Sequence, residues 1–201
     1  MYITLGELRK YLASTGGMGT GDDPLLEDSI KSAQAYINSE TNRVFEAVIE
    51  TKYYDRAALY RYNSSVLFIN EDLLTITTLT NGDSAGTVIA NTKYWLGGVD
   101  GRTFERNLGA PYHAIKLTDA SGACWTWDID GWVSILGTWG FSATTPSDIK
   151  QAMFQLASYF YRLKDSQVFD VTTVPEMGQI ILPKGIPVGV VKIIAKYKRY
   201  F

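Results

Sequence analysis

Apolar residues recur every three or four positions in several stretches of the chain, the spacing of an amphipathic helix. The strongest stretch lies near residues 146–164, and its apolar positions are Ile149, Met153, Leu156, Ala157 and Phe160. Thr145 is a suitable N-cap and Pro146 suits the first helical position, so the start of this helix is well specified. The pattern predicts one long helix with an apolar face, on which the other elements pack.

Two further helices are predicted near the N-terminus. Thr4 and Glu7 form a capping-box pattern at the start of a helix over residues 4–13. Asp23 as cap and Pro24 at the first position begin a second helix, which fades around Thr41. We expect residues 1–43 to supply the N-terminal helices of a small bundle, and residues 141–165 to supply its long central helix.

Between residues 44 and 140 the helical spacing gives way to short alternating runs of β-branched and aromatic residues. Turn residues separate the runs, with turns predicted at 81–82 and 97–98. The candidate strands are 44–54, 66–69, 74–80, 87–90, 94–96, 114–118, 124–129 and 132–138. Such strands suit a small barrel, a sandwich or a folded-over meander. The predicted fold class is therefore α+β, a small helical bundle with a β-rich insertion.

The last part of the chain, residues 166–201, is predicted to combine an extended arm with a basic docking segment. Val190, Val191, Ile194 and Tyr197 are spaced for a short helix, although their β-branched neighbours leave a strand as the alternative. Five positive charges and no acid lie in this region: Lys184, Lys192, Lys196, Lys198 and Arg199.

Two interpretations fit this basic end equally well. The lysines can form a solvated cluster at the negative end of a helix dipole. Alternatively, the segment is an arm that docks on an acidic partner or lies near a DNA backbone. In that case Val191, Ile194 and Tyr197 provide the apolar anchor and the lysines provide electrostatic steering.

Composition limits the chemistry that the chain can perform. A single histidine, His113, and a single cysteine, Cys124, leave too few residues for a histidine or cysteine metal cluster or a disulfide framework. We expect a structural or surface histidine and a buried, inert thiol. Glu71, Asp72 and Asp128 are interpreted as solvated turn residues. No enzyme activity and no cofactor are expected.

The surface chemistry suggests assembly with other chains. A net charge of −2 argues against nucleic-acid binding over the whole surface, and neither a signal sequence nor a membrane-spanning stretch is recognisable. Tyrosine is abundant, with 13 residues, and is favoured at protein interfaces. The tryptophans are expected in the core and at interfaces, while a sugar-stacking platform is the alternative; they are Trp95, Trp125, Trp127, Trp132 and Trp139.

Several segments in a fixed order resemble the head-tail connector family of tailed phages, also called head-completion adaptors. They are ITLGELRKYL (3–12), DDPLLEDSI (22–30), AYINSETNRVF (35–45), YYD (53–55), LLTITTLTN (73–81), GTWGF (137–141), PSDIKQA (146–152), YFYR (159–162) and IPVGVVKIIAKYKR (186–199). The resemblance covers roughly the first 80 and the last 70 residues, and it leaves out the middle, about 83–130. Lys198 stands where an arginine pair is commoner in the family.

The resemblance implies a structural virion protein that forms a ring on the portal, extends the DNA channel and presents a surface to a neck, stopper or tail-completion protein. Double-stranded genomic DNA would pass through the ring without sequence recognition, and the subunit can be monomeric until it docks. The expected locations are the virion neck and, during assembly, the host cytoplasm. The family docks on the portal through its C-terminal segment, which implies this role for Val191, Ile194, Lys196, Tyr197 and Arg199.

Lys192 and Lys198 are the residues expected to contact the DNA channel or an acidic partner. Two other functions remain open beside the adaptor. One is another neck or tail ring protein, such as a tail terminator, and the other is a carbohydrate-binding β module.

Overall fold

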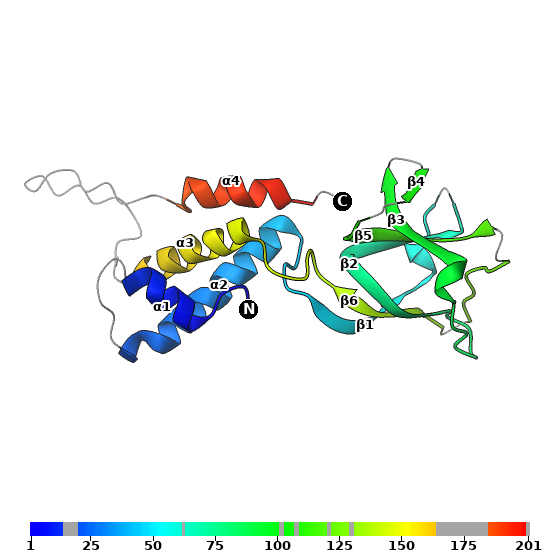
Figure 1. Ribbon diagram of the computed structural model, residues 1–201, viewed down its shortest axis with the longest axis horizontal. Coiled ribbons are helices and arrows are strands. Elements are labelled where there is room, and N and C mark those ends of the chain that lie inside the picture. Colours follow the sequence, from blue (N-terminus) through cyan, green and yellow to red (C-terminus); the bar gives the residue numbers. More distant parts are fainter. Residues whose placement is uncertain are drawn as a thin grey trace, which may run out of the picture. The chain divides into compact units, whose positions relative to one another are not determined.

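The computed structural model describes residues 1–13, 20–61, 63–100, 103–106, 109–119, 122–128, 131–163 and 185–199. The chain divides into two compact units, Met1–Arg43 with Thr145–Phe201, and Val44–Thr144. The first unit is helical and the second is built on a β-sheet (Figure 1). The predicted α+β class is confirmed.

The helical unit contains α1 (Leu5–Ala13), α2 (Asp23–Thr41), α3 (Ser147–Leu163) and α4 (Val188–Tyr197). Helices α2 and α3 pack along each other, and both α1 and α4 contact the pair. Of the apolar positions predicted for the long helix, Ile149, Met153, Leu156 and Ala157 are fully buried, whereas Phe160 is only partly buried. The apolar side of α2 is also fully buried, at Leu26, Ile30, Ala33 and Ile37. None of the helices within the described ranges has both the length and the apolar content that crossing a membrane requires.

The start of α1 matches its predicted capping box. The backbone N–H of Glu7 donates to Thr4 Oγ1 at 3.2 Å, and the backbone N–H of Thr4 donates to Glu7 Oε2 at 2.7 Å. These hydrogen bonds with Thr4 hold the pKa of the Glu7 carboxyl below its usual value.

The predicted cap of α2 was wrong by one residue. A 3-10 turn over Thr20–Asp22 leads into the helix, so Asp23 is already helical and Asp22 is the N-cap residue. The carboxylate of Asp22 makes no capping bond but accepts from the Tyr161 hydroxyl at 2.7 Å. Asp23 instead pairs with Arg9. At the other end Asn42, with φ of 53°, stops the helix close to the predicted position.

One antiparallel sheet organises the second unit. Its strands are β1 (Val48–Tyr54), β2 (Val66–Thr80), β3 (Tyr94–Asp100), β4 (Thr103–Arg106), β5 (Tyr112–Leu117) and β6 (Val133–Trp139). They lie in the order β1-β6-β2-β5-β3-β4, with β1 and β4 at the two edges (Figure 1). The sheet is open, so it closes into neither a small barrel nor a two-sheet sandwich.

The long strand β2 joins the two halves of this sheet. Residues Val66 to Phe68 pair with β5, Leu73 pairs with both β5 and β6, and the rest of the strand to Thr80 pairs with β6. The register with β5 shifts between Phe68 and Leu73, so a bulge interrupts this pairing. Two separate strands were predicted here, and that prediction was wrong because the chain stays extended through the polar residues between them.

Glu71 and Asp72 were predicted to be solvated turn residues, but both lie within β2. The Glu71 side chain is 42% exposed, as a solvated residue would be, whereas Asp72 is buried. Asp72 is 5% exposed, and its Oδ1 lies 3.5 Å from His113 Nε2. Glu71 accepts hydrogen bonds from the Tyr54 hydroxyl at 2.8 Å and from Lys52 Nζ at 3.3 Å. Burial, followed by the nearby Glu71 carboxylate, raises the pKa of Tyr54. Polar partners therefore let two adjacent acids lie inside a strand.

Other strand predictions were only partly right. Gly97 and Gly98 lie inside β3 and form no turn, and β4 was not predicted at all. A Cβ at Gly97 would lie 2.1 Å from the Glu105 carbonyl oxygen, so glycine permits the close approach of β4. The predicted strands at 87–90 and 124–129 contribute only isolated bridges, at Val88 and Trp127. Residue 129 and the predicted arm at 166–183 lie outside the described residues.

Three of the tryptophans contribute to the core of the sheet unit. Trp125 and Trp139 are 8% and 3% exposed, and their indole N–H groups donate to the carbonyls of Ser65 and Glu50. Trp127 packs against this core from its edge. The expected core role is therefore confirmed for Trp125 and Trp139.

Close packing between β2 and β6 makes Gly137 a sensitive position. A Cβ there would lie 2.3 Å from the Thr75 carbonyl oxygen, so Gly137→Ala forces the two backbones apart. We expect a loss of about 2 kcal/mol in unfolding free energy. Urea denaturation followed by tryptophan fluorescence measures this loss, because all five tryptophans lie within Val44–Thr144.

The matched control is Gly98→Ala, also within a strand, where a Cβ would have nothing within 4 Å. We expect this variant to unfold within about 0.5 kcal/mol of the parent protein. Equal losses in both variants would show that close approach to Thr75 is not the cause.

Candidate functional site

The predicted docking segment forms α4, which settles the choice between helix and strand in favour of a helix. The helix begins after Pro187, whose carbonyl accepts from the backbone N–H of Val190 at 2.9 Å. Proline fixes its own φ angle and has no backbone N–H to donate, so it suits the position just before the first residue of a helix. Figure 1 shows α4 lying alongside α3 within the helical unit.

One face of α4 belongs to the core of the helical unit. Val190 and Ile194, four residues apart, are 0% and 5% exposed. Residues at this spacing lie on the same side of a helix. Of the residues predicted to dock, Ile194 is therefore buried inside its own subunit, where it anchors α4.

The end of α4 is tied to α3 by a side-chain hydrogen bond. The Tyr197 hydroxyl donates to both carboxylate oxygens of Asp148, at 2.7 and 2.9 Å. Burial raises the pKa of Tyr197 to about 12, and the bond to Asp148 contributes in the same direction because the neighbouring carboxylate disfavours a phenolate. Tyr197 thus also holds the helix in place.

The residues after Tyr197 are tied to the end of α2. The backbone N–H of Arg199 donates to the Thr41 carbonyl at 3.0 Å, and the side-chain amide of Asn42 donates to the Arg199 carbonyl at 3.2 Å. Arg43 Nε donates to the Tyr197 carbonyl at 2.8 Å. Lys198 Nζ lies 3.5 Å from Glu40, so it already has an acidic neighbour within its own chain.

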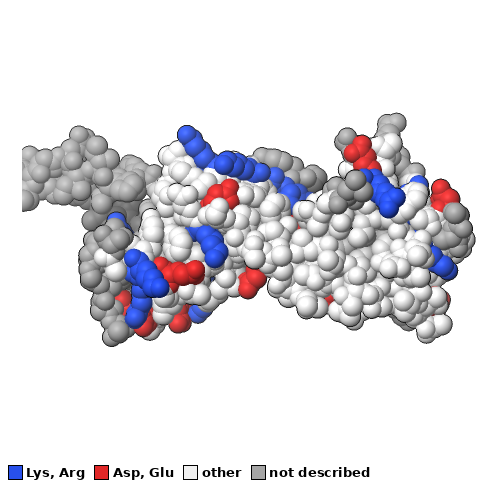
Figure 2. All heavy atoms as spheres, in the orientation of Figure 1, with Lys and Arg blue, Asp and Glu red and all other residues white. Residues whose placement is uncertain are grey.

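The opposite face of α4 is exposed and combines apolar and basic side chains. Val188 and Val191 are 69% and 49% exposed, and Lys192 and Lys196 are exposed one turn apart. Neither lysine has an ion-pair partner among the residues that the structure describes. Figure 2 shows basic side chains in a row along α4. We call Val188, Val191, Lys192 and Lys196 the outer face of α4.

Other candidate residues do not assemble a second site of this kind. His113 is partly buried and lies between Asp72 and the Glu71 carbonyl, which fits the expected structural role. Cys124 was predicted to be buried, and this was wrong: its side chain is exposed while the next residue, Trp125, turns inward. Within the described ranges no three His, Cys, Asp or Glu side chains are grouped so that they could hold a metal ion.

Asp128 and two of the tryptophans lie near the surface. Asp128 accepts from the backbone N–H of Ser84 at 2.5 Å, so it belongs to a loop contact. Trp95 is 38% exposed with Arg106 and Lys116 over its ring, and Trp132 is 52% exposed.

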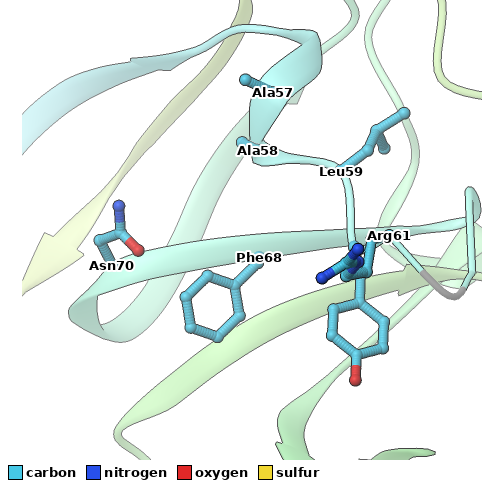
Figure 3. Close-up of a pocket in the computed structure, with 7 residues that line it drawn as sticks. Ala57, Ala58, Leu59, Arg61, Phe68 and Asn70 are labelled. Atoms are coloured by element: carbon cyan, nitrogen blue, oxygen red, sulfur yellow. The ribbon is translucent and has the colours of Figure 1, made fainter. Parts of the chain in front are cut away.

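A shallow pocket of about 360 Å³ lies in the sheet unit, where the 3-10 turn η2 (Arg56–Ala58) and the residues after it face β2 (Figure 3). Its lining is Ala57, Ala58, Leu59, Tyr60, Arg61, Phe68 and Asn70. Arg61 is the one charged side chain in this lining. The polar side chains of this lining are Tyr60, Arg61 and Asn70, and the lining contains no carboxylate, histidine or cysteine.

Comparisons with known proteins identify a shared fold. No family model matches the chain, and no curated protein matches it. Among solved structures, a chain of "Neck of empty GTA particle computed with C6 symmetry" matches with a TM-score of 0.64 and 21% identity. A chain of "Virion of native gene transfer agent (GTA) particle" matches with a TM-score of 0.63 and 21% identity. Each match covers 100% of this chain and 91% of the other.

The Tyr197 bond predicts a specific loss of stability at alkaline pH. Because the folded pKa, about 12, exceeds the unfolded value of about 10, the folded chain keeps this proton where the unfolded chain loses it. The contribution of Tyr197 is full below pH 10 and is lost as pH rises through about 12. In Tyr197→Phe, stability should therefore fall less steeply between these two pH values.

Urea unfolding followed by far-UV circular dichroism at several alkaline pH values measures the slope. Tyr159→Phe on α3 is the control, since no hydrogen bond of its hydroxyl is seen within the described residues. A Tyr197→Phe slope equal to that of the control and the parent protein would contradict the predicted linkage.

Proposed function

We propose that this protein is a structural, non-enzymatic subunit of the neck of a phage-like particle. The observation that carries the proposal is the likeness of fold over the full chain to a component of a structure described as the neck of a gene transfer agent particle, with a TM-score of 0.64. The order of segments that resembles head-tail connectors supports the same assignment independently. Its place would be the virion neck, after assembly in the host cytoplasm.

Within the neck, we assign it the role of the adaptor on the portal. Copies of the chain form a ring that extends the DNA channel and offers a surface to the next neck, stopper or tail-completion protein. The C6 symmetry of the similar neck structure supports a ring of identical subunits. DNA passes through without sequence recognition, in keeping with a net charge of −2 and basic residues confined to local regions.

The outer face of α4 is the surface that fits portal docking. Val191 and its exposed neighbour Val188 offer apolar area, while Lys192 and Lys196 offer charge to an acidic partner or to DNA. Ile194, Tyr197 and Arg199 serve docking by holding α4 against α2 and α3. Lys198 is exposed but already has Glu40 as an acidic neighbour at 3.5 Å.

Because α4 has one buried side and one exposed side, the docking role is better tested by point substitutions than by truncation. Removing everything after Gly185 would uncover the apolar side of α2 and α3 that Val190 and Ile194 cover. Such a truncation would combine a stability defect with a binding defect. Substitutions on the outer face separate the two effects.

Val191→Asp should weaken binding to the portal ring about tenfold or more, because it places a charge in an apolar contact next to the steering lysines. Leu25→Asp is the matched control: Leu25 is on α2 of the same unit and is 47% exposed, against 49% for Val191. Both variants should keep the thermal stability of the parent protein. Co-sedimentation with purified portal rings measures the difference between them.

Electron microscopy of the mixture tests the adaptor role itself. We expect a rotationally symmetric collar at the tail-facing end of the portal. If the protein instead caps tail tubes and leaves the portal bare, it belongs with the tail terminators, and the docking role of α4 is lost. Equal portal binding by Val191→Asp and Leu25→Asp would contradict the α4 assignment while leaving the neck assignment standing.

A further inference from the structure

The two edges of the sheet differ sharply in how they are protected. Strand β4, at one edge, has four residues, of which Glu105 and Arg106 are charged and exposed. Strand β1, at the other edge, has seven residues with an unbroken register and no proline, and among the described residues it pairs with β6 alone. Short length, charge, bulges and proline are the usual protections of an edge strand. β1 has no bulge or proline and is longer than β4, so its charged residues, Glu50 and Lys52, are the one protection of this kind that it has.

The side chains of β1 make this edge unusually apolar for a free surface. Ile49 is 74% exposed, Tyr53 is 65% exposed and Val48 is 45% exposed. Ile49, Thr51 and Tyr53 alternate along the strand and so share one face of the sheet. Opposite them on β6 lie Thr138, Leu136 and Ser134. This face therefore carries large apolar groups and hydroxyls but no charge.

The charges of β1 lie on its other face, at Glu50 and Lys52. Lys52 Nζ is 3.2 Å from Glu50 and 3.3 Å from Glu71, and it also lies over the Trp139 ring at 5.0 Å. Glu50 and Lys52 flank Thr51 on either side and carry opposite charges. A second copy of this strand, running in the opposite direction, is the partner that matches this pattern.

In an antiparallel pair of β1 strands related by a two-fold axis at Thr51, charged residues lie opposite residues of the other sign and large apolar residues lie opposite each other. Glu50 faces Lys52 of the other copy, and Ile49 faces Tyr53, in both cases twice by symmetry. All seven residues of the strand then pair, from Val48 to Tyr54. Moving the axis to Glu50 or to Lys52 would set like charges opposite each other and shorten the pairing.

We infer that the free protein forms a two-fold dimer by antiparallel pairing of β1 with β1 of a second copy, in the register centred on Thr51. The pairing joins the two sheets into one and removes both exposed β1 edges from water. It is an isologous contact, which closes on itself and does not propagate into a ring. The dimer therefore describes the protein before it enters the neck, and it does not depend on portal binding.

Cysteine crosslinking tests the register directly. In the Cys124→Ser background, which removes the native thiol, Thr51→Cys puts two sulfurs across the two-fold axis, with Cα atoms about 5 Å apart. Ile49→Cys is the control, because its two copies would lie four residues apart along the strands, about 13 Å. Under mild oxidation the full-length Thr51→Cys protein should form a disulfide-linked dimer, while Ile49→Cys stays mostly unlinked.

Sedimentation equilibrium of the full chain measures the dimer dissociation constant and so tests which side chains stabilise the contact. Ile49→Arg should raise the dimer dissociation constant about tenfold or more, since symmetry breaks the Ile49 contact twice. Val88→Arg is the control, with a side chain 62% exposed in a different part of the sheet unit. Glu50→Lys, which sets lysine against Lys52 of the other copy, should also weaken the dimer.

The inference would be overturned by a parent protein that stays monomeric at high micromolar concentration or by a dimer that Ile49→Arg leaves as tight as Val88→Arg does. Crosslinking through position 49 in preference to 51 would also overturn it. A parent protein that forms closed rings without portal would overturn it as well. Loss of the dimer in Ile49→Arg with unchanged portal binding would uphold it and separate it from the proposed neck function.

Discussion

The apolar contact between α2 and α3 is the interaction on which the helical unit depends. Ile30 and Ile37 from one helix and Ile149 and Leu156 from the other are fully buried. Segments more than 100 positions apart in the chain meet in this contact, so the β-rich unit is an insertion between the two helices. The same pair of helices forms the surface that receives α4.

Packing against that surface determines what α4 can offer to a partner. A helix that buries Val190 and Ile194 in its own subunit keeps only its other side for contacts. The hydrogen bonds of Tyr197 and Arg199 fix the rotation of the helix, and with it the direction of Val191 and Lys192. A preorganised helix face loses less conformational entropy on binding than an unfolded arm does. The outer face of α4, which we propose as the docking surface, is thus a product of the fold of the helical unit.

The sheet unit depends in a similar way on β2, which continues through a bulge as a single strand. Asp72 with His113, and Glu71 with Tyr54, satisfy two acids within a strand that would otherwise break there. Continuity of β2 lets β5 and β6 pair with the same strand, which places β1 at one edge and β4 at the other. An open sheet has edges by construction, and the apolar one at β1 is where the unit can add another strand.

The sequence alone determined the helices α1, α2 and α3, the extent of the β-rich region and the α+β class, because helical periodicity and capping are local properties. For the α4 segment it left a strand as the alternative. Thr4 with Glu7, and the spacing of Ile149, Met153 and Leu156, are examples. It could not determine that 66–80 is one strand, that Gly97 lies within a strand, or that Cys124 is exposed. Those outcomes depend on partners far along the chain, such as His113 for Asp72 and the Glu105 backbone for Gly97. For the same reason the sequence identified the basic C-terminal segment, but only tertiary packing decided that Ile194 faces inward while Val191 and Lys192 face solvent.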